Sequence, residues 1–251
     1  MARKVIIAGN WKMNLLPLQG EELVSELKER IESKENLEVV IFPQTGLLPL
    51  AIDWTIDSAI QLGAQNASSA LSGAYTGETS ADLLKTLGCS YCLAGHSERR
   101  SLYGETDEIV GQKAETYLSM GITPVICVGE SLAERESGKF LSVIENQVKI
   151  VFDQISKEGW PKLVWAYEPV WAIGTGKTAT ADQANEVHQF IRRQIQNLAG
   201  DIVANATSIL YGGSAKPSNA ADLLAQTDID GLLVGGASLK ADDFVDIIAA
   251  F

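Results

Sequence analysis

Eight short apolar runs recur along the chain, and each has the length of a buried β-strand. They follow one another at intervals of roughly thirty residues, which is the scale of one strand plus one helix. The regular repeat predicts a parallel sheet whose strands are joined by helices. The expected strands are Val5–Ala8, Val39–Phe42, Ala59–Leu62, Tyr91–Ala94, Pro124–Val128, Leu163–Tyr167, Ile209–Tyr211 and Leu232–Val234.

Helical patterns lie between most of these runs. The segment Glu21–Ile31 places Leu23, Leu27 and Ile31 on one face, as an amphipathic helix requires. No linker or low-complexity segment interrupts the alternation, so we expect residues 1–251 to form one domain. The other expected helices are Leu47–Ile52, Ala81–Leu87, Asp107–Met120, Phe140–Ile155, Ala181–Leu198, Ala220–Leu224 and Asp242–Ala249.

The ends of the strands distinguish an open sheet from a closed one. Polar or glycine-rich residues follow the first, fourth, sixth, seventh and eighth strands. An open sheet binds ligands at one switch point and would not gather all five ends. A closed ring brings them to a single mouth. The fold predicted is therefore α/β, a (β/α)8 barrel of eight parallel strands ringed by helices.

Composition narrows the classes of partner. The 251 residues carry a net charge of −12, which argues against nucleic acid and anionic membranes. No window approaches the apolar length of a membrane span. A small phosphorylated substrate remains compatible with the charge, because local backbone N–H groups and one lysine suffice to bind it.

The chain start and the cysteines favour a cytoplasmic protein. The apolar run within residues 1–9 is too short for a signal sequence. Three cysteines, Cys89, Cys92 and Cys127, do not make a disulfide framework, and the CxxC pair has no second pair for zinc. We expect no metal and no cofactor.

The sixth strand ends in a carboxylate, Glu168, and Pro169 keeps that residue extended. Large apolar residues in a glycine-containing loop indicate a segment that closes over a ligand and reopens. The alternative is an ordinary loop that follows a solvated strand end. A P-loop is excluded, because Gly176-Lys177-Thr178 would need glycine where Trp171 stands.

Two further strand ends carry candidate catalytic groups. Asn10 and Lys12 are two residues apart, so both point to one face, although a surface lysine is the alternative. His96 ends the fourth strand before Ser97, which we expect to cap a helix. A helix N-terminus disfavours an imidazolium, so His96 is expected to be neutral and to donate a hydrogen bond. His188 falls within a helical pattern and is expected to be structural.

Double glycines end the seventh and eighth strands, at Gly212-Gly213-Ser214 and Gly235-Gly236. Paired glycines let the backbone approach a ligand and aim its N–H groups at a phosphate. Barrels of this class commonly bind phosphate after strands seven and eight. Tight structural turns are the alternative. After the fifth strand, we expect a structural turn and a solvated charged helix at residues 134–138, with Cys127 packed behind Glu168.

Residues 166–176 resemble the signature of the triosephosphate isomerase family, and the other motifs follow that family's order over essentially the whole chain. The resemblance implies that Glu168 is the catalytic base, that His96, Lys12 and Asn10 act on the substrate, and that Glu98 supports them. It also implies phosphate binding by Asn10, Lys12, Gly174, Ser214, Gly235 and Gly236. A lid is implied that comprises Pro169, Val170, Trp171, Ala172, Ile173, Gly174, Thr175, Gly176, Lys177, Thr178 and, as its latch, Tyr211.

The same resemblance implies the reaction and the assembly. The expected activity is the cofactor-independent interconversion of dihydroxyacetone phosphate and D-glyceraldehyde 3-phosphate through an enediol(ate), a step of glycolysis and gluconeogenesis. The loop after the third strand, with Thr76 near its tip, is similar to a loop that joins two subunits in a homodimer. The alternatives are a Schiff-base sugar-phosphate aldolase that uses Lys12 and a phosphate-binding barrel without catalysis.

Overall fold

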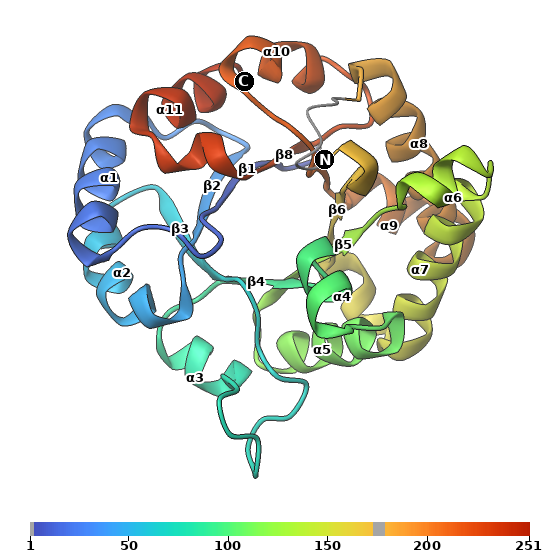
Figure 1. Cartoon of the computed structure of the whole chain (residues 1–251), viewed down its shortest axis with the longest axis horizontal. Coiled ribbons are helices and arrows are strands. Elements are labelled where there is room, and N and C mark those ends of the chain that lie inside the picture. Colours follow the sequence, from blue (N-terminus) through green and yellow to red (C-terminus); the bar gives the residue numbers. More distant parts are fainter. Residues whose placement is uncertain (1–2, 173–178) are drawn as a thin grey trace.

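Eight parallel strands close into a barrel in the order of the sequence (Figure 1). The computed structural model describes residues 3–172 and 179–251. The first strand pairs with both the second and the last, which closes the ring. The predicted fold class is therefore confirmed. The strands are β1 (Val5–Asn10), β2 (Leu37–Phe42), β3 (Ile60–Ala64), β4 (Tyr91–Ala94), β5 (Thr123–Val128), β6 (Val164–Tyr167), β7 (Ile209–Tyr211) and β8 (Gly231–Val234).

Helices surround the barrel and connect its strands (Figure 1). Short 3₁₀ turns are η1 (Thr45–Leu47), η2 (Lys157–Lys162), η3 (Val170–Ala172) and η4 (Gly236–Leu239). The α-helices are α1 (Pro17–Arg30), α2 (Leu48–Thr55), α3 (Ala81–Thr86), α4 (Ser97–Tyr103), α5 (Asp107–Ser119), α6 (Leu132–Glu136), α7 (Phe140–Gln154), α8 (Ala181–Ala199), α9 (Asp201–Ala206), α10 (Pro217–Leu224) and α11 (Ala241–Ala249).

Every predicted strand is present, but some helix boundaries were wrong. Helix α1 begins four residues before the predicted Glu21, because Pro17 occupies its first position and the Gln19 side chain accepts a hydrogen bond from the Leu16 N–H at 2.8 Å. Pro217 likewise starts α10 three residues before the predicted Ala220. Proline has the fixed φ that a helix start requires. Helix α9 was not predicted, because it is a short segment with little apolar periodicity.

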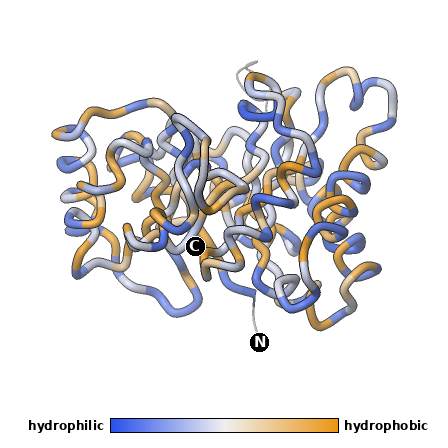
Figure 2. Tube along the Cα trace, turned by 90° about the horizontal axis from the view of Figure 1, so that it is seen from below, coloured by the Kyte–Doolittle hydropathy of each residue, from blue (hydrophilic) through white to orange (hydrophobic). Residues whose placement is uncertain are grey.

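Alternate residues of each strand face opposite sides of the barrel wall. On β1, Ile6 and Ala8 belong to the cluster that fills the barrel, whereas Ile7 packs in the cluster between barrel and helices. Along the helices, hydrophobic stretches alternate with hydrophilic ones (Figure 2). The hydrophobic residues pack in the outer cluster, between the helices and the barrel. Both clusters consist of buried side chains, so the barrel is a packed core and not a pore.

On two strands, the alternate residues that face the inside of the barrel continue past the strand end. The next residue in each series is polar and lies at the mouth of the barrel. On β1 the row Ile6, Ala8 leads to Asn10 with the two-residue period of a strand. On β6 the row Val164, Ala166 leads in the same way to Glu168. The strand period thus places side chains from distant parts of the chain at one end of the barrel.

His188 is a structural residue, as predicted. Its side chain is fully buried on α8, and its Nδ1 lies 3.2 Å from the carbonyl oxygen of Asp228. Burial lowers the pKa of His188 to about 3, so the ring is neutral at physiological pH. The ring also contacts Tyr167 edge to face, with 5.8 Å between the ring centroids.

The described residues contain neither a membrane-spanning helix nor a cluster of metal ligands. None of the helices in residues 3–172 and 179–251 is long and apolar enough to span a bilayer. Within the same ranges, no three His, Cys, Asp or Glu side chains gather in a way that could hold a metal ion.

Candidate active site

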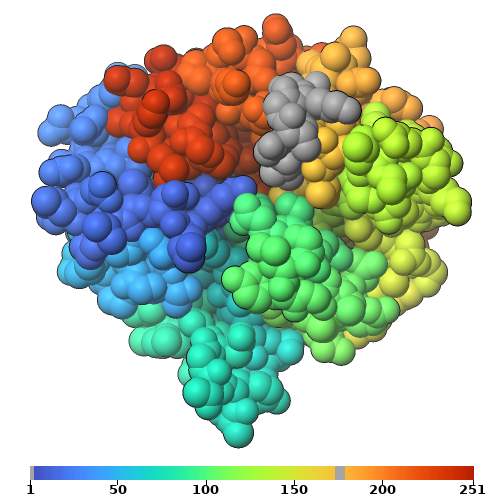
Figure 3. Space-filling view, viewed as in Figure 1, coloured from blue at the N-terminus to red at the C-terminus, as the bar shows by residue number. Residues whose placement is uncertain are grey.

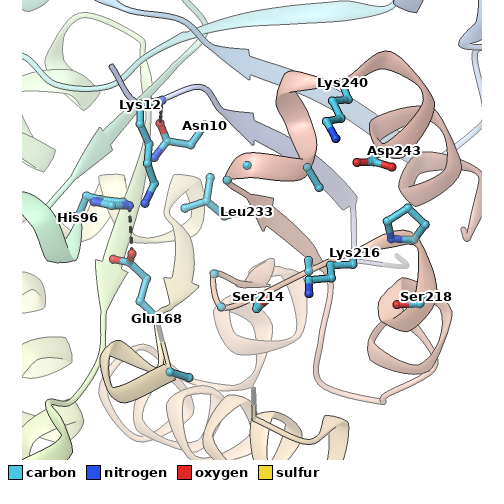
Figure 4. A pocket seen from close by; sticks show the side chains of 18 residues that line it. Asn10, Lys12, His96, Glu168, Ser214, Lys216, Ser218, Leu233, Lys240 and Asp243 are labelled. Atoms are coloured by element: carbon cyan, nitrogen blue, oxygen red, sulfur yellow. Dashed lines mark hydrogen bonds and ion pairs between the residues drawn. The ribbon is translucent and has the colours of Figure 1, made fainter. Parts of the chain in front are cut away.

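A cavity of about 780 Å³ opens at the end of the barrel where the strand carboxyl ends meet (Figure 4). Side chains that lie far apart in the sequence point into it from several strand ends. Among the predicted site residues, those that line the cavity are Asn10, Lys12, His96, Glu168, Ala172, Ser214, Gly235 and Gly236. Glu98 and Tyr211 are not part of this lining but contact residues that are: Glu98 accepts a hydrogen bond from Lys12, and the Tyr211 hydroxyl lies against Gly213.

The Glu168 carboxylate is 2% exposed and is held from two sides. Ser97 donates twice, from its backbone N–H to Oε2 at 2.9 Å and from its hydroxyl to Oε1 at 3.0 Å. The Nε2 of His96 lies 3.1 Å from Oε1. The solvated strand end that we considered as the alternative is therefore wrong. Three donors compensate the loss of water around a buried carboxylate.

Glycines leave the space that the Glu168 segment occupies. A Cβ at Gly129 would lie 1.8 Å from the backbone oxygen of Glu168, a distance that no atom pair tolerates. A Cβ at Gly212 would lie 2.9 Å from the Glu168 side chain. These two positions show that the glycines after β5 and β7 are needed for close packing around the carboxylate.

His96 caps α4, which corrects the prediction that Ser97 would be the cap. The Nδ1 of His96 accepts a hydrogen bond from the Glu98 N–H at 3.2 Å. An accepting Nδ1 carries a lone pair, so the proton of a neutral ring resides on Nε2. That Nε2–H points at Glu168 (Figure 4). Ser97 is thus not the cap of α4 but a second donor to the same carboxylate.

Lys12 is held in a specific position at the mouth. Its Nζ donates to Glu98 Oε1 at 2.6 Å, and its backbone N–H donates to Asn10 Oδ1 at 3.0 Å. Its φ of 53° lies in the left-handed region, which costs about 1–3 kcal/mol for a residue other than glycine. The Gln65 amide offsets part of that cost, because it donates to the Lys12 carbonyl at 2.7 Å. Lys12 is therefore not a free surface lysine.

The double-glycine turns also line the cavity, and Ser214 lies on the side away from His96 (Figure 4). Gly236 begins the turn η4, and the Ser238 hydroxyl donates to the Gly235 carbonyl at 2.7 Å. The Ser214 carbonyl accepts from the Asn219 amide at 3.0 Å, which fixes the loop after β7. Gly174, also predicted to bind phosphate, lies outside the described residues.

The first part of the predicted lid contacts a buried glutamate. Trp171, in η3, donates from Nε1 to Glu130 at 2.8 Å, and the Glu130 side chain is fully buried. Tyr167 and Arg135 bond the same Glu130 oxygen at 3.1 and 2.8 Å. The charged helix predicted after β5 exists as α6, but Arg135 is not simply solvated. The predicted lid residues Ile173, Gly174, Thr175, Gly176, Lys177 and Thr178 lie outside the described residues.

Tyr211, the predicted latch, lies under the lid's first residue. A Cβ at Gly213 would lie 2.3 Å from the Tyr211 hydroxyl and 2.8 Å from the Pro169 ring. The Tyr211 hydroxyl has no hydrogen-bond partner among the described residues. The tyrosine is thus next to the lid, as the latch prediction requires.

Cys127 lies against Glu168, as predicted, and is not a nucleophile. It is fully buried on β5. Burial, and then the neighbouring Glu168 carboxylate, raise the pKa of the Cys127 thiol well above its ordinary value. A thiol that does not ionise cannot attack a substrate.

Three positioning residues were not predicted. Ser97 was expected only as a cap, and no role was expected for Gln65 or Glu130. Polar residues directly after buried strands were the available indication, because that position lies at the barrel mouth. Which of them contact Glu168 or Lys12 depends on backbone geometry that no spacing reveals.

Comparison with known proteins gives one consistent result. The triosephosphate isomerase family model matches residues 5–251. A Bacteroides fragilis protein named triosephosphate isomerase is 50% identical over 252 residues, which cover 99% of each chain. Proteins of the same name from Hydrogenovibrio crunogenus and Flavobacterium johnsoniae are 48% and 46% identical, and each match covers 99% of this chain and at least 98% of the relative.

The packing around Glu168 predicts the effect of a methyl group at Gly129. In Gly129→Ala the new Cβ must displace the backbone of Glu168, so we expect the free energy of unfolding in urea to fall by about 3 kcal/mol or more. Gly46→Ala is the control, because a Cβ there meets no atom within 4 Å. We expect that control to change stability by less than about 0.5 kcal/mol. Equal effects of the two substitutions would contradict the packing.

Proposed function

The chain belongs to the triosephosphate isomerase family, and we propose that it interconverts dihydroxyacetone phosphate and D-glyceraldehyde 3-phosphate with Glu168 as the catalytic base. The observation that carries the proposal is the convergence of Glu168, His96 and Lys12 in one cavity (Figure 4). This triad offers a proton acceptor, a neutral hydrogen-bond donor and a cation within a single pocket. The reaction is an aldose–ketose isomerisation of glycolysis and gluconeogenesis.

Glu168 removes the proton from the substrate carbon that lies between the carbonyl and the hydroxyl. The electron pair of that C–H bond forms the C–C double bond of an enediolate, and the carbonyl oxygen takes the negative charge. The hydroxyl proton of the first carbon then passes to the former carbonyl oxygen, which becomes a hydroxyl. The carboxylic acid returns a proton to the neighbouring carbon, the C–C double bond is lost, and a carbonyl forms at the first carbon, so the ketose becomes an aldose. Without substrate, Ser97 and His96 satisfy the carboxylate. The substrate would take the place of the His96 contact, which leaves His96 free to act on the substrate.

His96 and Lys12 stabilise the oxygen that becomes negative. The Nε2–H of a neutral His96 donates to that oxygen, a role that is already known for this family. The Lys12 ammonium contributes a positive charge on the same side of the cavity, and Asn10 orients the oxygens. Glu98 supports them indirectly, since it holds the Lys12 side chain and extends from the helix that His96 caps.

The phosphate of the substrate occupies the double-glycine side of the cavity. The amides of Ser214, Gly235 and Gly236 contribute there, together with Gly174 from the lid. Binding energy from this remote group supports chemistry at the reacting carbons. The lid, residues 169–178, closes over the substrate, with Tyr211 as its latch, and suppresses loss of phosphate from the enediolate.

The Schiff-base aldolase is the weaker alternative. A lysine that attacks a carbonyl must lose its proton, usually in an apolar pocket. Lys12 instead forms an ion pair with Glu98 at 2.6 Å and its side chain is 30% exposed, so it does not lie in an apolar pocket. A barrel that only binds phosphate is also disfavoured, since it would have no need for a buried carboxylate aligned with a histidine.

We also propose a homodimer in the cytoplasm. The loop after β3 extends away from the barrel, and Thr76 at its tip is exposed (Figure 1). Large apolar side chains are exposed after β1, in this loop and at the end of α4, with 87% of Met13, 55% of Tyr75 and 73% of Leu102 accessible. Figure 3 shows these three segments on one face. Exposed apolar groups of this kind mark protein interfaces.

The base assignment is tested by Glu168→Gln. An amide cannot accept the substrate proton, so we expect kcat to fall by about 10²–10⁴-fold. Competition by inorganic phosphate should survive, because phosphate binds at the opposite side of the cavity. Turnover is measured with chelator present and no added cofactor. Glu136→Gln, an exposed carboxylate on α6, is the control and should retain full activity. Near-normal turnover of Glu168→Gln would show that another group is the base.

The dimer is tested by sedimentation. We expect the wild-type protein to sediment at twice the 27.0 kDa mass of the chain. Tyr75→Glu places a charge in the proposed interface and should shift the protein to the mass of one chain. Ile202→Glu is the control, since Ile202 on α9 is 89% exposed but lies outside the proposed interface. A monomeric wild type, or dissociation by both substitutions, would contradict the assignment.

A further inference from the structure

The cavity extends beyond the residues that the isomerisation uses. Its volume of about 780 Å³ lies in the range of roughly 300–1,000 Å³ that holds drug-sized ligands, which are larger than a triose phosphate. The additional lining comes from the starts of two helices, with Lys216 and Ser218 at α10 and Lys240 and Asp243 at α11. Figure 4 shows these side chains beyond Ser214, on the side away from His96 and Glu168.

Two ammonium groups in this outer part have no partner among the residues that the structure describes. Lys216 and Lys240 are both exposed, and neither side chain forms a hydrogen bond or ion pair with any residue that the structure describes. Lys12 differs, because Glu98 already neutralises part of its charge. The outer lysines thus keep their full charge available to a ligand.

The local charge is opposite to that of the whole protein. The chain carries a net charge of −12, yet this part of the cavity contains two lysines and one carboxylate, Asp243. Asp243 belongs to the first turn of α11, where a helix dipole stabilises a negative side chain without help from a lysine. The outer part therefore has a surplus of positive charge at the mouth of a pocket already suited to phosphate.

We propose that Lys216 and Lys240 form an outer anion site that binds the second phosphoryl group of a small bisphosphorylated molecule. The first phosphoryl group of that ligand occupies the site at Ser214, Gly235 and Gly236, so the inference rests on the phosphate position of the proposed function. Triose monophosphates leave the outer site empty. Small bisphosphates are then competitive inhibitors that occupy both sites and block the mouth.

The test compares inhibitors that differ only in the second phosphate. Linear alkanediol bisphosphates with three to six carbons are each compared with the alkyl monophosphate of equal length, as competitive inhibitors of the isomerisation. At the best length we expect the bisphosphate to bind at least tenfold more tightly. The quantity compared is the inhibition constant of the monophosphate divided by that of the bisphosphate. In the double variant Lys216→Gln/Lys240→Gln we expect this ratio to fall below twofold.

Two further variants separate a specific site from a general effect of charge. Lys162→Gln removes a lysine from the turn that precedes β6, at the opposite end of the barrel, and should keep the ratio. Asp243→Asn removes the one carboxylate that the described residues contribute to the outer part, so it should raise the ratio. Damage to the fold would lower the ratio instead.

The outcomes that overturn the outer site are distinct from those that overturn the reaction. The outer site is overturned if the ratio of inhibition constants is near one at every chain length. It is also overturned if the ratio is unchanged in the double variant, or if Asp243→Asn does not raise it. In each of these cases, turnover and inhibition by monophosphates would leave the proposed function intact. Failure of the monophosphates to inhibit would contradict the phosphate position of the proposed function, and the outer site with it.

Discussion

The hydrogen bonds to the Glu168 carboxylate are the constraint on which the rest of the site depends. A buried carboxylate destabilises a protein unless donors replace the water it has lost. Ser97 and His96 provide those donors, so the start of α4 must lie close to the end of β6, one strand away around the ring. Gly129 and Gly212 leave room for this arrangement. In the proposed reaction, the same contacts hold the base in place until a substrate displaces the histidine.

The closed barrel makes such precision possible. Each strand is paired on both sides, so the strand ends that carry Asn10, His96 and Glu168 cannot shift independently. The strained backbone of Lys12 persists because Asn10 and Gln65 hold it. A rigid frame of this kind stabilises developing charge without reorganising during the reaction. The first residues of the proposed lid are anchored at the buried Glu130, through the Trp171 side chain.

Periodicity was sufficient to predict the barrel, because both the strand repeat and the strand ends follow from local sequence. The candidate residues Glu168, His96 and Lys12 were also predictable, since each stands within two residues of the end of a buried strand. The cap of α4 was not, because a histidine and a serine are adjacent there and only backbone geometry decides between them. Contacts such as Gln65 with Lys12 link distant segments and leave no trace in local spacing.

The most direct test of Glu168 as a proton acceptor is isomerisation of dihydroxyacetone phosphate in D₂O, followed by NMR of the product. A carboxylic acid formed during the reaction exchanges its proton with solvent, so the account predicts deuterium on the carbon that becomes C2 of D-glyceraldehyde 3-phosphate. Complete retention of the substrate hydrogen at that carbon would mean direct hydride transfer. That result would contradict the assignment of Glu168, and the role of the buried carboxylate would have to be sought elsewhere.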